Sequence, residues 1–178
     1  FGGGPNKDVS EEYDGTSWTE GNNLNTGRNS ATGFGTQAAA VMAGGAGSLT
    51  TTENYDGTNW TASGALSTAR KYLAGAGTQT AGLGFGGYTS PSPSGLSATE
   101  EYDGSSWTSG GALSPTTWAS AGTGTQTAAL KAGGAGGSPG PTAVVNTQEY
   151  DGSSWTAGGD MISANKSNHG AGTQTAAL

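Results

Sequence analysis

Short segments with alternating apolar and polar residues flank a recurrent Asp-Gly pair, and this pattern predicts β-hairpins. The first of them reads Glu-Glu-Tyr-Asp-Gly-Thr-Ser-Trp-Thr, and an Asp-Gly pair between two such segments favours a two-residue type I′ turn, whose central residues both need positive φ. With Asp-Gly as the turn, Glu11 pairs with Trp18. Tyr13 and Trp18 are then diagonal neighbours on one face, and we expect them to form the outer packing unit of a sheet.

Two further segments consist almost entirely of small residues. Lys71–Gly77 and Thr80–Gly87 are rich in Ala and Gly and are joined by Thr78 and Gln79. Small residues weaken a strand unless another backbone approaches it closely, as happens where the inner strands of a propeller converge on the axis. We therefore expect these two segments to be inner strands.

The same elements recur four times, at spacings of 42, 47 and 48 residues. A period in this range indicates a repeat architecture. A Trp follows each Tyr by five residues, and a Leu or Met follows it by eleven. All variation in length lies between a diglycine and the next Tyr, so this segment is predicted to be a loop. The Tyr-Asp-Gly motifs begin at Tyr13, Tyr55, Tyr102 and Tyr150, and the Gly-Thr-Gln motifs at Gly35, Gly77, Gly124 and Gly172.

Each repeat resembles the Kelch repeat of β-propellers. Gly86-Gly87, Tyr102 and Trp107 stand where the diglycine, the tyrosine and the tryptophan of a Kelch repeat stand, and Arg28 and Arg70 match an arginine often found ahead of its first strand. The resemblance covers nearly the whole chain. It implies an all-β, Kelch-like propeller of four-stranded antiparallel blades, with residues 1–178 forming a single propeller domain or part of one.

Two departures and a second resemblance qualify this expectation. The arginine is replaced in the last two repeats, and the second strand of the third repeat, Ala128–Ala132, lacks a bulky aliphatic run. The combination of Tyr-Asp-Gly-Ser-Ser-Trp-Thr with Gly-Thr-Gln-Thr-Ala-Ala-Leu also resembles repeat arrays in predicted virion and tail-fibre proteins of marine bacteriophages. That second resemblance implies a place on a virion surface.

The two ends of the chain align within one strand of the repeat. Thr175–Leu178 aligns with Thr127–Leu130, and Phe1–Gly3 aligns with Phe85–Gly87, which leaves one repeat position unfilled. The chain therefore either closes a four-bladed ring or belongs to a larger array. We favour the larger array, because a blade split inside a strand leaves its ladder of hydrogen bonds broken.

Composition narrows the class of protein. Glycine accounts for 35 of 178 residues and charged residues for 11%, against averages of about 7% and about 25%, so a coiled coil or long helical bundle is excluded. The net charge of −7 argues against a nucleic-acid partner, which needs a basic surface. No apolar run of about 18 residues is present, so we expect no membrane insertion.

The chain offers little chemistry for metals or catalysis. It has no cysteine and one histidine, His169, so thiolate sites and multi-histidine sites are excluded and we expect a loop histidine. For the Asp of each Tyr-Asp-Gly motif we favour a turn role over a Ca²⁺ site. The pairs Glu11-Glu12 and Glu100-Glu101 are expected at solvated sheet edges. We predict no cofactor and no metal.

Positions that vary within the repeat are the candidates for function. The position 16 residues after each Tyr is occupied by Asn29, Lys71, Trp118 and Lys166, and the preceding position by Arg28, Arg70, Thr117 and Asn165. In a propeller these positions and the loop after the second strand emerge on the same face, around one mouth. Trp118 is either a platform for stacking a sugar ring or a residue packed beneath its own loop. The candidate ligand-binding residues are Tyr88, Trp118, Asn29, Lys71, Lys166, Arg28 and Arg70.

These features predict a non-enzymatic binding module, outside the cell or on a virion surface, that adheres to a host glycan or receptor. The glutamines of the Gly-Thr-Gln motifs are expected to tie a turn to the neighbouring blade. A purely structural fibre or decoration protein, which has other virion or filament proteins or further copies of itself as partners, is the alternative. An enzyme on a Kelch-type propeller ranks third, since the convergent ionisable residues that mark one are scarce.

Overall fold

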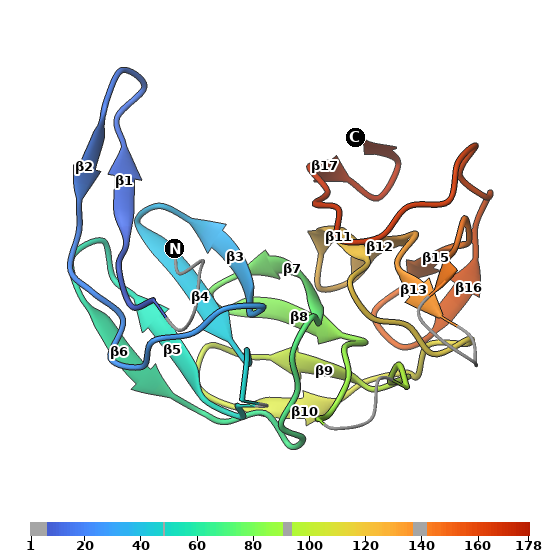
Figure 1. Cartoon of the computed structure of the whole chain (residues 1–178), viewed down its shortest axis with the longest axis horizontal. Coiled ribbons are helices and arrows are strands. Elements are labelled where there is room, and N and C mark those ends of the chain that lie inside the picture. The colour runs from blue at the N-terminus through green and yellow to red at the C-terminus, as the bar shows by residue number, and fades with distance from the viewer. Residues whose placement is uncertain (1–6, 48, 91–93, 137–141) are drawn as a thin grey trace.

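All regular structure in the described part of the chain is β. A computed structural model describes residues 7–47, 49–90, 94–136 and 142–178, none of which is helical. Figure 1 shows antiparallel sheets that follow one another along the chain in an open arc, with the first hairpin at one end and the last at the other. The expected all-β class and its construction from four-stranded antiparallel sheets are confirmed.

Three four-stranded sheets form the body of the arc. Sheet 1 contains β3 (Thr32–Thr36), β4 (Ala39–Ala43), β5 (Thr52–Tyr55) and β6 (Trp60–Ser63). Sheet 2 contains β7 (Ala74–Thr78), β8 (Ala81–Phe85), β9 (Thr99–Tyr102) and β10 (Trp107–Ser109). Sheet 3 contains β11 (Ala121–Thr125), β12 (Ala128–Ala132), β15 (Thr147–Tyr150) and β16 (Trp155–Ala157).

Two hairpins flank the three sheets, and a third is inserted in sheet 3. The N-terminal hairpin consists of β1 (Glu11–Tyr13) and β2 (Trp18–Glu20), and the C-terminal hairpin of β17 (Gly172–Thr173) and β18 (Ala176–Ala177). The inserted hairpin pairs β13 (Ala135–Gly136) with β14 (Thr142–Ala143). The N-terminal and C-terminal hairpins form separate two-stranded sheets, so the four-bladed ring is not closed among the described residues; Phe1–Gly3 lie outside them.

The turn at each Tyr-Asp-Gly motif is longer than the sequence predicted. Tyr13 pairs directly with Trp18, so four residues connect the strands. Only the glycine has positive φ, 97° at Gly15, while Asp14 accepts hydrogen bonds from two backbone N–H groups of the loop at 2.8 Å. These bonds hold the pKa of Asp14 below its usual value. The predicted type I′ turn with Glu11 opposite Trp18 is wrong, because the aspartate side chain stabilises a four-residue loop instead.

The direct pairing brings each Tyr ring against its Trp ring. In sheet 1 the ring centroids of Tyr55 and Trp60 lie 4.9 Å apart, and the two residues are only 4% and 5% exposed. In the N-terminal hairpin the same pair, Tyr13 and Trp18, is 46% and 66% exposed. The leucine that follows the Tyr by eleven residues is buried in the first three repeats, where Leu24, Leu66 and Leu113 are each 3% exposed.

The inner strands approach one another as closely as their composition predicted. β3 packs against β7, and β7 against β11. A Cβ placed on Gly75 would lie 2.5 Å from the hydroxyl oxygen of Thr32, and one on Gly122 would lie 2.6 Å from the carbonyl oxygen of Gly75. Neither space admits a methyl group, so glycine is required there by contact between sheets.

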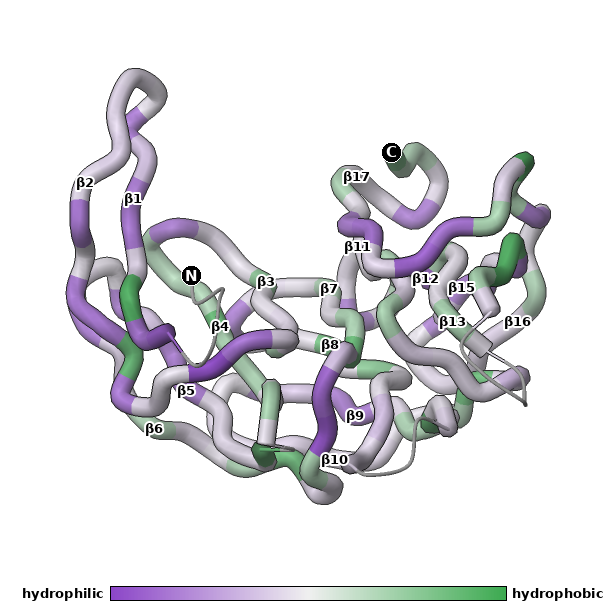
Figure 2. The backbone as a smooth tube through the Cα atoms, in the orientation of Figure 1, coloured by the Kyte–Doolittle hydropathy of each residue, from purple (hydrophilic) through white to green (hydrophobic). Residues whose placement is uncertain are grey.

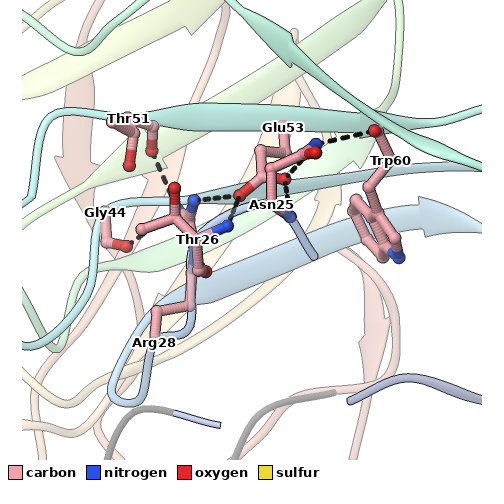
Figure 3. A network of polar contacts seen from close by, with 7 residues as sticks. All are labelled: Asn25, Thr26, Arg28, Gly44, Thr51, Glu53 and Trp60. Carbon is pink, nitrogen blue, oxygen red and sulfur yellow. Dashed lines mark hydrogen bonds and ion pairs between the residues drawn. The ribbon is translucent and has the colours of Figure 1, made fainter. Parts of the chain in front are cut away.

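Buried ion pairs hold the segments ahead of the inner strands to sheets 1 and 2. Arg28 donates to Glu53 at 2.5 Å and Arg70 to Glu100 at 2.6 Å, with all four side chains buried. Figure 3 shows that Glu53 also accepts hydrogen bonds from Asn25. The expected solvated edge is therefore wrong for Glu100, because β9 lies inside sheet 2 between β8 and β10 and the Glu100 side chain is buried against Arg70.

Sheet 3 replaces this ion pair with a different polar core. Thr117 and Gln148 take the places of the arginine and the glutamate, and both are buried. Lys131 enters the core from β12 and donates to the backbone and side-chain oxygens of Asn146 at 3.2 and 3.0 Å. Burial lowers the pKa of Lys131 to about 8. The segment Ala128–Ala132, which lacks a bulky aliphatic run, thus contributes a buried lysine to the core, and Asn146 satisfies its hydrogen bonds.

Candidate functional site

The segments ahead of the inner strands are joined by backbone hydrogen bonds that run from one repeat to the next. Tyr72 N–H donates to the Ser30 carbonyl, Ala119 N–H to Tyr72, and Ser167 N–H to Ala119, each at 2.8 Å. These four residues have φ between 51° and 60°, which is unfavourable for residues other than glycine. The four-fold recurrence of this conformation fixes the direction in which the neighbouring variable positions project.

Three aromatic rings from sheets 2 and 3 meet beside this ladder. Tyr72 stacks on Tyr88 with centroids 5.7 Å apart and planes 9° apart. Trp118 packs edge-on against both, with centroids 5.7 Å from Tyr72 and 5.1 Å from Tyr88. We call Tyr72, Tyr88 and Trp118 the aromatic cluster.

The Lys71 ammonium group lies against the aromatic cluster. The Nζ atom of Lys71 lies 5.1 Å from the centroid of the Tyr88 ring, within the range of a cation–π interaction. Antiparallel bridges fix the backbone here, between Lys71 and Tyr88 and between Trp118 and Ala135. The cluster therefore stands on paired backbone, and its rings are preorganised.

The rings remain accessible to solvent. Tyr72 is 37% exposed, and Lys71, Tyr88 and Trp118 are partly exposed. An aromatic ring presents an apolar face and, in Tyr and Trp, a polar group at its edge. This combination suits a ligand that has both apolar C–H faces and hydroxyl groups, as a sugar ring does.

A cavity of about 430 Å³ adjoins the aromatic cluster where the four segments converge. Its lining includes Asn29, Tyr72, Ser120, Asn168 and His169. Within the described residues, Ser120 Oγ and Asn168 Oδ1 are buried and have no hydrogen-bond partner. Buried polar atoms of this kind normally find a partner, so the cavity wall retains unused capacity for hydrogen bonding.

The structure brings some of the sequence candidates together and separates others. It brings Lys71, Tyr88 and Trp118 together, as expected for residues around one mouth. Asn29 lines the adjoining cavity, while Lys166 is exposed on the segment before β17, outside the aromatic cluster. His169 is exposed, as predicted for a loop residue, and it also lines the cavity.

The prediction that Arg28 and Arg70 bind a ligand is wrong. They are 1% and 0% exposed and are engaged in the buried ion pairs, so their guanidinium groups do not face a ligand at the mouth. Their physical role is to bind backbone carbonyls and a carboxylate inside the sheet; Arg28, for example, donates to the carbonyls of Gly44 and Thr51.

The sequence did not single out Tyr72. It was placed inside a predicted strand, whereas β7 begins at Ala74 and Tyr72 adopts a φ of 55°. Variation between the repeats could have identified Tyr72, because the equivalent positions in the other repeats hold the small residues Ser30, Ala119 and Ser167. A large aromatic residue at one copy of a small-residue position marks a place that the fold does not dictate.

The expected role of the recurrent glutamines is confirmed for Gln79, Gln126 and Gln174. Gln79 donates to the carbonyl oxygens of Ala40 and Tyr55 in the preceding sheet. Gln126 and Gln174 make the same two bonds one and two sheets further on. These amides bind sheet to sheet and are not available as ligand contacts.

Comparison with known proteins supports the fold. No family model and no curated protein matches the chain. Among solved structures, that of YjhT superposes with a TM-score of 0.75 at 11% sequence identity, covering 91% of this chain and 65% of the other. The chain thus spans about two thirds of the length of the structure it matches.

The described residues contain no helix long and apolar enough to span a membrane. The same residues contain no group of three or more His, Cys, Asp or Glu side chains placed to hold a metal ion. Together with the structural likeness, the sheet arrangement shows an all-β, propeller-like fold.

Proposed function

We propose that the chain is part of a Kelch-type β-propeller that acts as a non-enzymatic binding module, displayed outside the cell or on a virion, and that its aromatic cluster binds a glycan of the host surface. The observation that carries the proposal is the meeting of Tyr72, Tyr88 and Trp118 with Lys71 at one exposed place. Each of the three rings departs from its equivalents in the other repeats, so the repeat fold alone does not account for the aromatic cluster.

The chemistry of the aromatic cluster favours a neutral or acidic sugar. Tyr and Trp rings stack on the C–H faces of a sugar, while the Tyr hydroxyls and the indole N–H hydrogen-bond to its hydroxyl groups. The Lys71 ammonium adds attraction for a carboxylate or sulfate substituent. Such contacts gain little over water individually, so affinity at one site is expected to be weak and many copies on one particle would raise the avidity.

The use of charge elsewhere supports a binding role over an enzymatic one. Catalytic sites gather ionisable groups with perturbed pKa values around a pocket. Here the buried charges of sheets 1 and 2 are paired with one another inside the sheets, and the groups that converge on the aromatic cluster are rings and one ammonium.

The test presents the folded chain multivalently to a glycan array and to host cells. Trp118→Ala and Tyr88→Ala should abolish specific binding, while the melting temperature stays close to that of the parent. Lys71→Met should weaken binding to acidic glycans, and Lys166→Met, at the same register but outside the aromatic cluster, should not. Absence of binding at every valency would overturn the proposal in favour of the purely structural alternative.

A further inference from the structure

Four residues at the same position of the repeat line the cavity beside the aromatic cluster. Each follows directly on one of the four residues of positive φ that the backbone ladder joins, so the ladder holds all four in equivalent places. The four wall residues are Ala31 ahead of β3, Leu73 ahead of β7, Ser120 ahead of β11 and Asn168 ahead of β17. The repeat therefore places four side chains around one space, and their chemistry determines what that space can hold.

The four wall residues give the cavity an apolar side and a polar side. Ala31 and Leu73 come from neighbouring repeats and have no hydrogen-bonding side chain, whereas Ser120 and Asn168 come from the next two repeats and carry a hydroxyl and an amide. The same backbone position thus accepts both kinds of residue, so the repeat fold does not dictate the polar pair. A ligand with an apolar face and a polar edge matches this division.

The two polar wall residues are not satisfied within the chain. Ser120 is only 7% exposed, and among the described residues neither its Oγ atom nor the Oδ1 atom of Asn168 has a hydrogen-bond partner. A buried polar atom without a partner lowers stability, and the first two repeats avoid this loss with apolar residues at the same position. Groups that the fold does not use, and that lower its stability, point to a ligand that uses them.

The size of the cavity exceeds what a bridging water needs. Its volume is about 430 Å³, whereas one water molecule takes up about 30 Å³ of the liquid. Pockets that bind small ligands have volumes of about 300 to 1,000 Å³. The cavity therefore has room for a ligand the size of a ring, which can contact the apolar and the polar wall residues together.

The polar groups of the cavity favour a neutral ligand that carries hydroxyl groups. The guanidinium of Arg28, which is among the lining residues, is already paired with Glu53 inside sheet 1. The groups left without a partner are a hydroxyl and an amide oxygen. An amide oxygen only accepts hydrogen bonds, whereas a hydroxyl donates and accepts. A carboxylate brings no donor to Asn168, but a sugar hydroxyl brings both a donor and an acceptor.

The cavity and the aromatic cluster share Tyr72, which stacks on Tyr88 and also lines the cavity. Figure 2 shows hydrophilic residues on the segments that lead into β3, β7 and β17, and these segments border the cavity. We propose that the cavity is a second subsite, which binds a neutral sugar unit linked to the unit that stacks on the aromatic cluster. This inference rests on the proposed function and extends it, because the site then recognises two adjacent sugar units.

Sugars of increasing length test the second subsite. Glucose, galactose, mannose and N-acetylglucosamine, and the neutral dimers of each, are titrated into the parent chain and followed by NMR. In at least one series the second unit should raise the affinity about tenfold, as two new hydrogen bonds would provide, and dimers of uronic acids should show no such gain. Ser120→Ala and Asn168→Ala should each lower the affinity for the dimer about 2- to 10-fold and leave that for the single unit unchanged. Ser109→Ala, an exposed position on β10, should change neither, and Trp118→Ala should weaken both.

The outcomes separate this inference from the function on which it rests. Absence of binding by sugars of every length overturns both. Binding of single units without a gain from the second unit, or a gain that persists in Ser120→Ala and Asn168→Ala, overturns the second subsite alone.

The melting temperature of the free chain gives a readout that does not depend on a ligand. Ser120→Ala should leave it unchanged or raise it, because the hydroxyl has no partner among the described residues. A clear drop would mean that the hydroxyl serves the fold, and would overturn its assignment to a ligand. Ser120→Leu, which copies Leu73 of the second repeat, should fill the cavity, remove the gain from the second sugar unit and keep the binding of single units.

Discussion

The Nη2 atom of Arg28 lies 2.5 Å from the Oε1 atom of Glu53, and both side chains are buried. The guanidinium also donates to the carbonyls of Thr26, Gly44 and Thr51, so one side chain ties the segment ahead of β3 to the ends of β4 and β5 (Figure 3). Arg28, which the sequence suggested as a ligand contact, is therefore a structural residue that holds the segment ahead of β3 in place.

The equivalent pair in sheet 2 gives the first prediction. Arg70→Met should lower the free energy of unfolding by about 3 to 5 kcal/mol, because it leaves the Glu100 carboxylate buried and unpaired. The double variant Arg70→Thr with Glu100→Gln copies Thr117 and Gln148 of sheet 3 and should lose less than the single variant. Urea unfolding measures both, and a double variant less stable than Arg70→Met would contradict the assignment.

Lys131 gives a prediction on pH. Its folded pKa of about 8 lies below the ordinary lysine value of 10.5, so between these values the unfolded chain binds more protons and stability rises with pH. From pH 8 to 10 we expect a gain of about 1 to 2 kcal/mol, at most about 1.4 kcal/mol per pH unit. The measurement stops at pH 10, because Tyr55 and Tyr150, whose pKa values are raised to about 12, reduce stability above it.

The control for this prediction is Lys131→Met, which removes the titrating group and keeps the length of the side chain. Its stability should lack the gain between pH 8 and 10. An equal gain in the variant and the parent would assign the pH dependence to another group.

The Tyr and Trp pairs give a prediction with an internal control. Trp60→Ala should cost roughly 3 to 5 kcal/mol, as expected for the loss of a buried indole. Trp18→Ala, at the same register but 66% exposed, should cost about 1 kcal/mol or less. Denaturant midpoints compare the two, and equal losses would mean that burial of the Trp is not the source of its contribution to stability.

Two glycines with positive φ, Gly86 of a diglycine and Gly15 of a turn, distinguish the cost of backbone strain from the cost of a steric clash. A Cβ on Gly86 would lie 2.7 Å from the Thr117 carbonyl oxygen, whereas one on Gly15 meets nothing within 4 Å, although φ is positive at both. Gly15→Ala should therefore cost about 1 to 2 kcal/mol, the price of the left-handed conformation alone, and Gly86→Ala should cost clearly more. Thermal melts of the two variants decide this, and equal shifts would remove close approach as the reason for the diglycine.

Most of what could be predicted about the fold came from the sequence repeat. A fixed register of Tyr-Asp-Gly, Trp and Gly-Thr-Gln indicates four-stranded units without any long-range information, and the packing of Gly and Ala predicted close inner strands. The turn was predicted wrongly because the bonds from the Asp14 side chain to the loop backbone stabilise a longer loop than Asp-Gly alone suggests. Local sequence does not state which of these competing conformations has the lower energy.

The site was less predictable, since its residues meet only through the packing of sheets. Variation within the repeat identified Lys71, Tyr88 and Trp118, but it gave equal standing to Arg28 and Arg70. Their carboxylate partners lie 25 and 30 residues further along the chain, and only the fold shows that these charges are paired inside a sheet. Tyr72 was missed because a strand was assigned across it.

Contact between a glycan and Trp118 tests the central claim most directly. A glycan that is positive on the array is titrated into the parent chain and into Trp118→Phe, and the change in tryptophan fluorescence is followed alongside binding. The proposal predicts a saturable change in the parent chain, and in Trp118→Phe the loss of most of that change with binding retained, because phenylalanine keeps the stacking face. An unaltered fluorescence change in Trp118→Phe would place the ligand elsewhere on the molecule and contradict the proposal.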